Sequence, residues 1–376
     1  MNLPLKGYLS VLVLTSGFAL TILGLSSCGE SGNDEKANKR LVNSSKVDDR
    51  ELSGQEALRL FLPTDNREIF GDPSKFYMYT NRTFEGVQSK PWEGGQYGFV
   101  RNQIRSPLGV IYTRLHEGMD IRPVRRDGRG EPLDDVRTIA DGVVTHVNDT
   151  ASASNYGKYV VVRHSWREGA FYSLYAHLMT TRAKVGQNVR AGDTLGRLGY
   201  TGAGIDRERA HVHVELNFLL SERFTTWYSK HFTSPNKHGI HNGINMTGMD
   251  IARFFLEHRK NPAITMREFL DGEEVYYKVK APVSGVPGIL QRYPFLGKGM
   301  EGARSAKSWE FSFAQTGVPL SISPSSTELK YPAVTWVKPM NTNHSYLTMG
   351  RLSGSGSRAS LSASGSRYIQ LISESF

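Results

Sequence analysis

Histidine and aspartate side chains recur in two short segments whose spacing suits a metal ion. His116 and Asp120 stand four residues apart with Gly118 between them, and His211 and His213 stand two apart. Glycine lets the chain bend sharply, so His116 and Asp120 can converge on one point. If the second segment is a strand, His211 and His213 point to the same face, because side chains alternate along a strand. A lone His-x-His pair is equally consistent with two histidines beside a core.

Together the two segments offer the ligands of a catalytic zinc site. Zn²⁺ binds His nitrogen and Asp oxygen in a tetrahedron, and catalytic sites leave one of the four positions to water. Two histidines and one carboxylate are the ligands of many zinc peptidases. Zinc lowers the pKa of its bound water toward neutrality and so creates a nucleophile. A cupin site is disfavoured, since Glu215 does not have the spacing from the His pair that its ligand Glu would require.

The order of these residues resembles the LytM and lysostaphin family of peptidoglycan endopeptidases, which are zinc metallopeptidases. The resemblance spans roughly residues 98–218. The segments that carry it are Gly118-Met119-Asp120-Ile121, Ala140 to Val144, Tyr156 to His164, Ser173 to Leu178, Val185 to Gly192, Gly199 to Gly202 and Ala210 to Glu215. It implies a mainly β fold, with an antiparallel sheet or sandwich and short helices.

The resemblance also implies a role for each matching residue. His116, Asp120 and His213 are expected to bind Zn²⁺. His177 and His211 are expected to be catalytic, beside the open coordination position. There they can deprotonate the water or hydrogen-bond the oxyanion that forms at the scissile carbonyl. The spacing does not tell which of the two is the base. The implied function is a zinc-dependent endopeptidase that hydrolyses peptide cross-links of bacterial peptidoglycan by metal-activated water.

Some positions depart from the family pattern or are better interpreted as structural. Residues 205–209 replace the usual small residues before the His-x-His, and residues 124–136 form a charged insertion. Both border the expected groove and bear on substrate preference rather than on metal binding. His164 follows a run of valines and is interpreted as structural. On a strand, Glu215 shares the face of His213, where it can make a supporting hydrogen bond.

The N-terminus has the features of an export signal. A basic start is followed by the apolar run from Leu9 to Gly24 and by Leu25-Ser26-Ser27-Cys28. This pattern predicts a secretory signal peptide, and its end resembles a lipobox. Cys28, the only cysteine, is therefore the expected lipid-attachment residue. We expect an exported protein anchored by lipid to a bacterial membrane, with an uncleaved signal anchor as the alternative.

Composition and hydrophobic patterning divide the chain into several expected regions. The expected division is 1–27 signal peptide, 28–52 flexible tether, 53–96 N-terminal extension, 97–225 peptidase domain, 226–262 loop and helix, and 263–376 a smaller β-rich C-terminal domain. The helix is expected at residues 250–260. The strands expected after it are at 275–279, 309–313, 319–322, 333–337 and 368–372.

Net charge and motif content limit the partners. The chain has 376 residues and a formal net charge of +10, which can attract nucleic acid, anionic lipid or an anionic wall polymer. It has no nucleic-acid-binding motif, so the expected partners are peptidoglycan peptides and, through the lipid anchor, a membrane. Two alternatives remain: a non-catalytic wall-binding regulator of amidases, and a zinc peptidase that acts on proteins.

Overall fold

The computed structural model describes residues 58–376. The predicted signal peptide, Cys28 and the predicted tether lie outside the described residues. Within the described part of the chain, no helix has the length and apolar character needed to cross a membrane.

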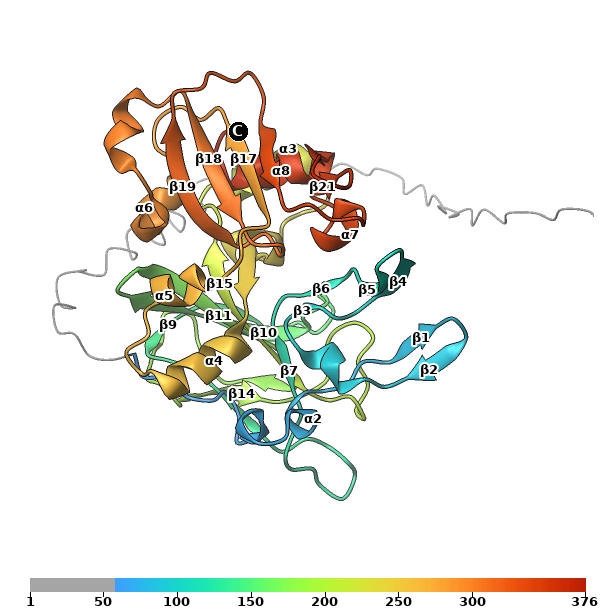
Figure 1. The fold of residues 1–376 in the computed structure, drawn as a ribbon. Coiled ribbons are helices and arrows are strands. Elements are labelled where there is room, and N and C mark those ends of the chain that lie inside the picture. Colours follow the sequence, from blue (N-terminus) through green and yellow to red (C-terminus); the bar gives the residue numbers. More distant parts are fainter. Residues whose placement is uncertain (1–57) are drawn as a thin grey trace, which may run out of the picture. The chain divides into compact units, whose positions relative to one another are not determined.

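A seven-stranded antiparallel sheet forms the centre of the fold (Figure 1). Its path runs β13-β9-β10-β11-β15-β16, and β7 also pairs with β15. The strands are β7 (Met119–Ile121), β9 (Gly142–Asn148), β10 (Lys158–Trp166), β11 (Gly169–Leu178), β13 (Asn188–Val189), β15 (Val212–Leu219) and β16 (Met246–Met249). All eight residues of β15 are buried, because strands flank it and side chains cover both faces.

The two faces of this sheet have different neighbours. Val160, Val212 and Val214 belong to the main hydrophobic core. Val161 and Leu174 belong to a smaller cluster on the opposite face. Since side chains alternate along a strand, the residues between the core valines of β15 point toward the smaller cluster.

Shorter strands and helices surround the sheet. The remaining strands before residue 225 are β1 (Arg82–Phe84), β2 (Val87–Ser89), β3 (Gly98–Phe99), β4 (Gln103–Ser106), β5 (Gly109–Tyr112), β6 (Leu115–His116), β8 (Asp135–Arg137), β12 (Thr180–Thr181) and β14 (Thr194–Arg197). They pair as β1-β2, β3-β6, β4-β5 and β12-β14-β8. The helical turns of this part are η2 (Glu68–Phe70), α2 (Pro73–Phe76) and η3 (Trp92–Gly95).

A connecting region follows β15. It contains α3 (Phe224–His231), η4 (Gly239–His241), η5 (Gly243–Asn245), β16 and α4 (Ile251–Lys260). Helix α4 begins where the Asp250 side chain accepts a hydrogen bond from the Arg253 backbone N–H, which is a typical N-cap. Its buried residues include Ile251, Phe254 and Phe255, so the expected helix at residues 250–260 is confirmed.

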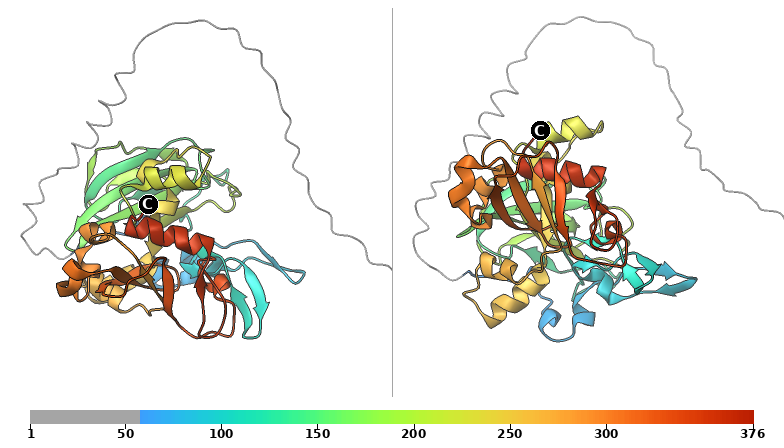
Figure 2. Two further views of the ribbon diagram at one scale, coloured as in Figure 1. Left: turned by 90° about the horizontal axis from the view of Figure 1, so that it is seen from above. Right: turned by 45° about the horizontal axis from the view of Figure 1, so that its top comes forward.

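The C-terminal region has its own four-stranded antiparallel sheet, in the order β19-β18-β17-β20. Figures 1 and 2 show it in orange and red beside the central sheet. Its strands are β17 (Tyr277–Ala281), β18 (Ser308–Phe313), β19 (Pro319–Ser325) and β20 (Ala333–Val337), with a separate pair of β21 (Leu352–Ser353) and β22 (Ser360–Leu361). Its helices are α5 (Met266–Asp271), α6 (Gly288–Arg292), η6 (Pro294–Leu296), η7 (Met300–Ser305), α7 (His344–Leu347) and α8 (Ala363–Ser373).

The C-terminal sheet and the central sheet share one hydrophobic core. Tyr293 is fully buried, and its hydroxyl accepts a hydrogen bond from the Leu219 N–H at 2.8 Å and donates one to the Ala170 carbonyl at 2.7 Å. Arg292 Nε donates to the Leu219 carbonyl at 3.3 Å. The C-terminal region is thus held directly against the end of β15.

The predicted fold class is confirmed: the protein is mainly β, with antiparallel sheets and short helices. One predicted strand is wrong, because residues 368–372 lie in helix α8. Ser362 caps this helix by accepting from the Gly365 N–H. Tyr368, Ile369 and Ile372 are buried at helical spacing, a pattern that a five-residue apolar window does not distinguish from a strand.

Candidate metal and catalytic centre

Three predicted ligands meet at one point. The Asp120 Oδ1 atom lies 3.0 Å from His116 Nε2 and 2.9 Å from His213 Nδ1, and the two ring nitrogens lie 2.9 Å apart. All three side chains are buried. Among the described residues, this trio is the group of His, Cys, Asp or Glu side chains with ligand atoms close enough to hold a metal ion.

Strand pairing brings the ligands together. His116 ends β6, Asp120 is in β7, and β7 pairs with β15 so that Asp120 is directly opposite His213. Gly118 lies between the first two, and a Cβ atom there would come within 2.3 Å of the Val214 carbonyl oxygen. The glycine is thus needed for the close approach of this turn to β15. From the sequence we expected Gly118 to permit a sharp bend.

The hydrogen bonds of the two ligand rings decide which nitrogens carry protons. His116 Nδ1 lies 2.6 Å from the Gln96 carbonyl oxygen, and His213 Nε2 lies 2.8 Å from Glu215 Oε1. Both partners only accept hydrogen bonds, so these nitrogens are the donors. In the neutral rings, His116 Nε2 and His213 Nδ1 therefore present lone pairs to the Asp120 carboxylate.

Three electron-rich atoms at this separation require a positive charge among them. Burial disfavours charge on His213, but its hydrogen bonds with Asp120 and Glu215 outweigh this and raise its pKa to about 10. Burial lowers the pKa of His116 to about 4. Zinc ligands at roughly 2.0–2.2 Å in a tetrahedron are about 3.4 Å apart, so the trio needs to open by only a few tenths of an ångström. The donor set and spacing thus suit Zn²⁺.

Arg101 holds the other oxygen of the ligand carboxylate. Its Nη2 atom lies 2.7 Å from Asp120 Oδ2, which leaves Oδ1 facing the two rings. Burial alone would raise the pKa of Asp120, but His116, His211 and Arg101 outweigh it and hold that pKa well below its usual value. Asp120 is therefore a fixed, ionised carboxylate, which suits a metal ion.

His177 and His211 lie beside the trio as expected. Their ring centroids are 4.9 Å apart, and His211 Nε2 is 3.6 Å from Asp120 Oδ1. His177 Nδ1 donates to the Thr201 carbonyl at 2.9 Å, and His211 Nδ1 donates to the Arg209 carbonyl at 2.6 Å. Burial lowers both pKa values. Each ring is therefore neutral, with an unprotonated Nε2 that can accept a proton.

The backbone at His177 is in an unusual conformation. His177 has a φ of +62° at the end of β11, a region that non-glycine residues rarely adopt. Its N–H donates to the Tyr156 carbonyl at 2.9 Å. Such strained residues persist where the surrounding structure fixes them, and they gather at active sites.

Glu215 is the centre of a hydrogen-bond network behind the ligand His213. It accepts from His213 at 2.8 Å, from the Tyr156 hydroxyl at 2.6 Å and from Asn217 Nδ2 at 2.9 Å. Burial would raise the pKa of Glu215, but these bonds hold it below its ordinary value. A carboxylate behind a ligand histidine orients the ring and increases its basicity.

The remaining histidines lie outside this centre. His164 is fully buried and bonds to the Asp141 carbonyl and the Ser173 hydroxyl, which supports a structural role. His146, on β9, lies near His238 and His241 of the connecting region, and its ring centroid is 5.9 Å and 5.3 Å from theirs.

The two segments that depart from the family pattern contact each other. Arg126, in the charged insertion, donates to the carbonyls of Arg207 and Glu208 at 2.7 Å and 3.0 Å. The Tyr79 hydroxyl donates to Glu208 Oε1 at 2.7 Å. The Arg209 carbonyl of the same segment accepts from His211, so the two contacting segments adjoin His211.

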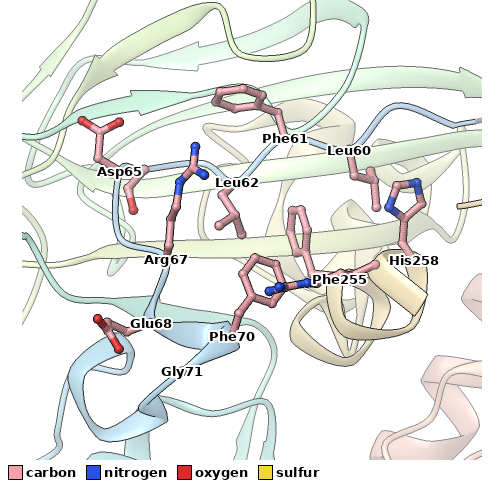
Figure 3. A pocket seen from close by; sticks show the side chains of 12 residues that line it. Leu60, Phe61, Leu62, Asp65, Arg67, Glu68, Phe70, Gly71, Phe255 and His258 are labelled. Atoms are coloured by element: carbon pink, nitrogen blue, oxygen red, sulfur yellow. The ribbon is translucent and has the colours of Figure 1, made fainter. Parts of the chain in front are cut away.

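A cavity lies away from the five predicted ligand and catalytic residues. It has a volume of about 630 Å³ and lies between residues 60–71 and helix α4. Figure 3 shows Phe70 and Leu62 facing Phe255 and His258 there. None of the five predicted ligand and catalytic residues lines it, so it is a separate feature.

Comparison with known proteins agrees with this geometry. Residues 114–223 match the family model described as Peptidase family M23. The cell division protein DipM of Caulobacter vibrioides is 31% identical over 116 residues, which is 31% of this chain and 17% of that protein. The chain thus spans about a sixth of the length of this relative. Residues 114–223 are thus similar to peptidase family M23, in agreement with the resemblance seen in the sequence.

Solved structures of similar proteins include two peptidase domains and one larger enzyme. The lysostaphin catalytic domain of Staphylococcus simulans is 21% identical, covering 37% of this chain and 79% of its own, with a TM-score of 0.23. A mutant catalytic domain of the prophage-encoded M23 protein EnpA of Enterococcus faecalis is 20% identical, with the same coverages and a TM-score of 0.24. A zinc-containing peptidase of Vibrio cholerae is 22% identical, covering 38% and 36%, with a TM-score of 0.24.

Sequence reasoning missed the supporting role of four residues. Gln96 and Thr201 act through backbone carbonyls, for which residue type carries no signal. Arg101 lies nineteen residues before Asp120, and nothing in its local sequence marks it as a partner. Tyr156 lay within a quoted family segment, but only the structure reveals its bond to Glu215.

Proposed function

We propose that this protein is a zinc-dependent endopeptidase that hydrolyses peptide cross-links of bacterial peptidoglycan. The observation that carries the proposal is the meeting of His116, Asp120 and His213 with two neutral histidines beside them. Zinc would be held by that trio, where it would activate a water and polarise the scissile carbonyl. The peptidase family of residues 114–223 supports the same reaction class.

The chain's own residues supply proton transfer and orientation. His177 and His211 each present an unprotonated Nε2, so one can accept a proton from the attacking water and return it to the leaving amine. Before it releases that proton, the same ring can donate a hydrogen bond from Nε2 to the oxyanion. The Thr201 and Arg209 carbonyls keep both rings in the required tautomer.

The alternative of a non-catalytic wall-binding regulator has less support. A regulator needs no complete ligand set, whereas this chain retains all three ligands and both catalytic histidines in one buried group. A peptidase that acts on proteins would use the same centre, and only the substrate would separate it from the leading proposal.

Metal analysis and a digest test the proposal. Protein purified without chelator should contain about one zinc per chain, and His116→Ala should lose both zinc and activity. Mass spectrometry of purified peptidoglycan after incubation should show new peptide ends. A zinc-loaded protein that leaves peptidoglycan intact but cleaves an unfolded protein would favour the protein-directed alternative. If the zinc-loaded protein cleaves neither peptidoglycan nor the unfolded protein, the hypothesis of a non-catalytic regulator is favoured.

We also propose that the protein is exported and anchored by lipid at Cys28. The proposal rests on the apolar run and the Leu25-Ser26-Ser27-Cys28 ending, and a lipid-anchored peptidase would have wall peptides within reach. Cys28→Ser should block processing or release the protein from membranes. An unchanged membrane fraction and unchanged mature size would contradict this.

A further inference from the structure

A second cavity lies between the peptidase domain and the C-terminal region. Its volume is about 380 Å³, within the roughly 300–1,000 Å³ typical of ligand sites. One wall comes from the peptidase domain and from η5 and β16. The C-terminal region contributes Thr316, Met349, Arg351, Ser364, Arg367, Tyr368 and Leu371.

This cavity begins next to the metal ligands. Glu117, which follows the ligand His116 in sequence, lines it, and so does Tyr156. The Tyr156 ring centroid is 5.8 Å from that of His213, and the Tyr156 hydroxyl bonds to Glu215. One layer of side chains therefore belongs to both the catalytic centre and the cavity.

The far wall carries a cation with no partner among the described residues. Arg351 donates to the Thr316 carbonyl at 2.7 Å and lies 4.2 Å from the centre of the Tyr368 ring, so its guanidinium is already engaged. Arg367, on α8, makes no hydrogen bond or ion pair with any residue from 58 to 376. Ser364 is three residues earlier on the same helix, so both side chains share one face.

Helix α8 adds to the positive character of this wall. Ser364 lies in its first turn, where the helix N-terminus carries partial positive charge. Arginine binds carboxylates well because its planar guanidinium matches the two oxygens. The cavity also contains Met246, Met349 and Leu371, whose apolar side chains suit short aliphatic groups and, for methionine, adapt to different shapes.

We propose that this cavity is a substrate subsite, in which Arg367 binds a free carboxylate of the wall peptide. The proposal rests on the peptidoglycan endopeptidase function proposed above. It gives the C-terminal region a role, because the M23 domain alone supplies only one wall of the subsite. Arg367 is thereby a specificity-determining residue, distinct from the metal ligands and the catalytic histidines.

The test compares two substrates and three variants of the full zinc-loaded protein. The substrates are cross-linked peptides isolated from peptidoglycan, either with free carboxylates or after conversion of the carboxylates to amides. The variants are Arg367→Gln, Arg367→Lys and the matched control Arg358→Gln. Arg358 is an exposed arginine on the nearby β21–β22 hairpin.

Loss of a charged hydrogen bond should raise KM of Arg367→Gln for the free-carboxylate substrate by about tenfold to a hundredfold. Zinc content and kcat should stay near those of the unmodified protein, and Arg367→Lys should recover part of the loss. On the amidated substrate, Arg367→Gln and the unmodified protein should have similar KM values. Arg358→Gln should behave like the unmodified protein on both.

Equal KM values for Arg367→Gln and the unmodified protein on the free-carboxylate substrate would overturn the subsite. So would a drop in kcat accompanied by zinc loss, since that would indicate a structural role. If the zinc-loaded protein cuts neither substrate, the proposed function has failed, and calorimetric binding of the free-carboxylate peptides then decides the subsite separately. Binding weakened by Arg367→Gln would support it, and no binding, or equal binding, would overturn it.

Discussion

Replacement of Glu215 by Gln should weaken zinc binding without removing a ligand. Glu215 is 1% exposed and accepts hydrogen bonds from His213, Tyr156 and Asn217. The substitution keeps the size of the side chain but removes the negative charge behind the ligand ring. The His213 ring is then held less firmly, and its nitrogen is less basic. Both effects lower the affinity for zinc.

The magnitude follows from the kind of contact that is lost. A hydrogen bond to a charged group contributes about 1.5–3 kcal/mol, and loss of a supporting partner behind a metal ligand typically costs about 10–100-fold in affinity. These ranges agree, because tenfold corresponds to about 1.4 kcal/mol. We therefore expect the zinc dissociation constant of Glu215→Gln to rise about 10–100-fold.

A competition titration with a fluorescent chelator would measure this constant. Tyr156→Phe is the matched control, because it removes one of the three bonds but keeps the carboxylate and its bond to His213, so its effect should be smaller. In the double variant, Tyr156→Phe should add little to Glu215→Gln, since the charged acceptor is already gone. A Glu215→Gln dissociation constant within twofold of the unmodified protein would refute the reasoning.

Three further predictions concern the catalytic rate, the turn at the ligands and the pH dependence of stability. His177→Ala should keep zinc but lose about 10²–10⁴-fold in peptidoglycan hydrolysis, and a wild-type rate would show that its assigned role is wrong. Gly118→Ala should destabilise by at least about 1–3 kcal/mol in denaturant unfolding, because the new Cβ would be 2.3 Å from a carbonyl oxygen; Gly128→Ala, with no atom within 4 Å of its Cβ, should not. Burial lowers the pKa of His164 to about 4 from 6.5, so the folded state resists its protonation, and stability present above pH 6.5 should fall by about 3 kcal/mol as pH drops to 4. His164→Gln should lack this part of the pH dependence, and an identical slope in both proteins would contradict it.

The secondary structure was predictable where the pattern is long or strongly capped. The valine-rich segment of β10 and the alternating β15 have the period of strands, and α4 has a capping Asp250 and helical spacing. Helix α8 was misread because its apolar residues form a short cluster. Its Ser/Gly-rich first half gave no helical signal, and packing against the C-terminal sheet stabilises the helix in spite of this composition.

The sequence by itself determined the chemistry of the centre. His116, Asp120, His177, His211 and His213 are identifiable because only a few residue types bind zinc or transfer protons, and because their order around the glycines matches a family. Strand periodicity also places His211, His213 and Glu215 on one face, since alternation is a local property of the backbone.

Only the tertiary structure decided how the centre is supported and what lies beside it. Arg101 reaches Asp120, Tyr156 reaches Glu215, and Arg367 reaches the cavity next to Glu117 from the far end of the chain. Such contacts join residues that are separated by tens to hundreds of positions, and each depends on how sheets and helices pack. Local sequence does not encode that packing, so the residues of the cluster could be named in advance, but their supporting residues and the second cavity could not.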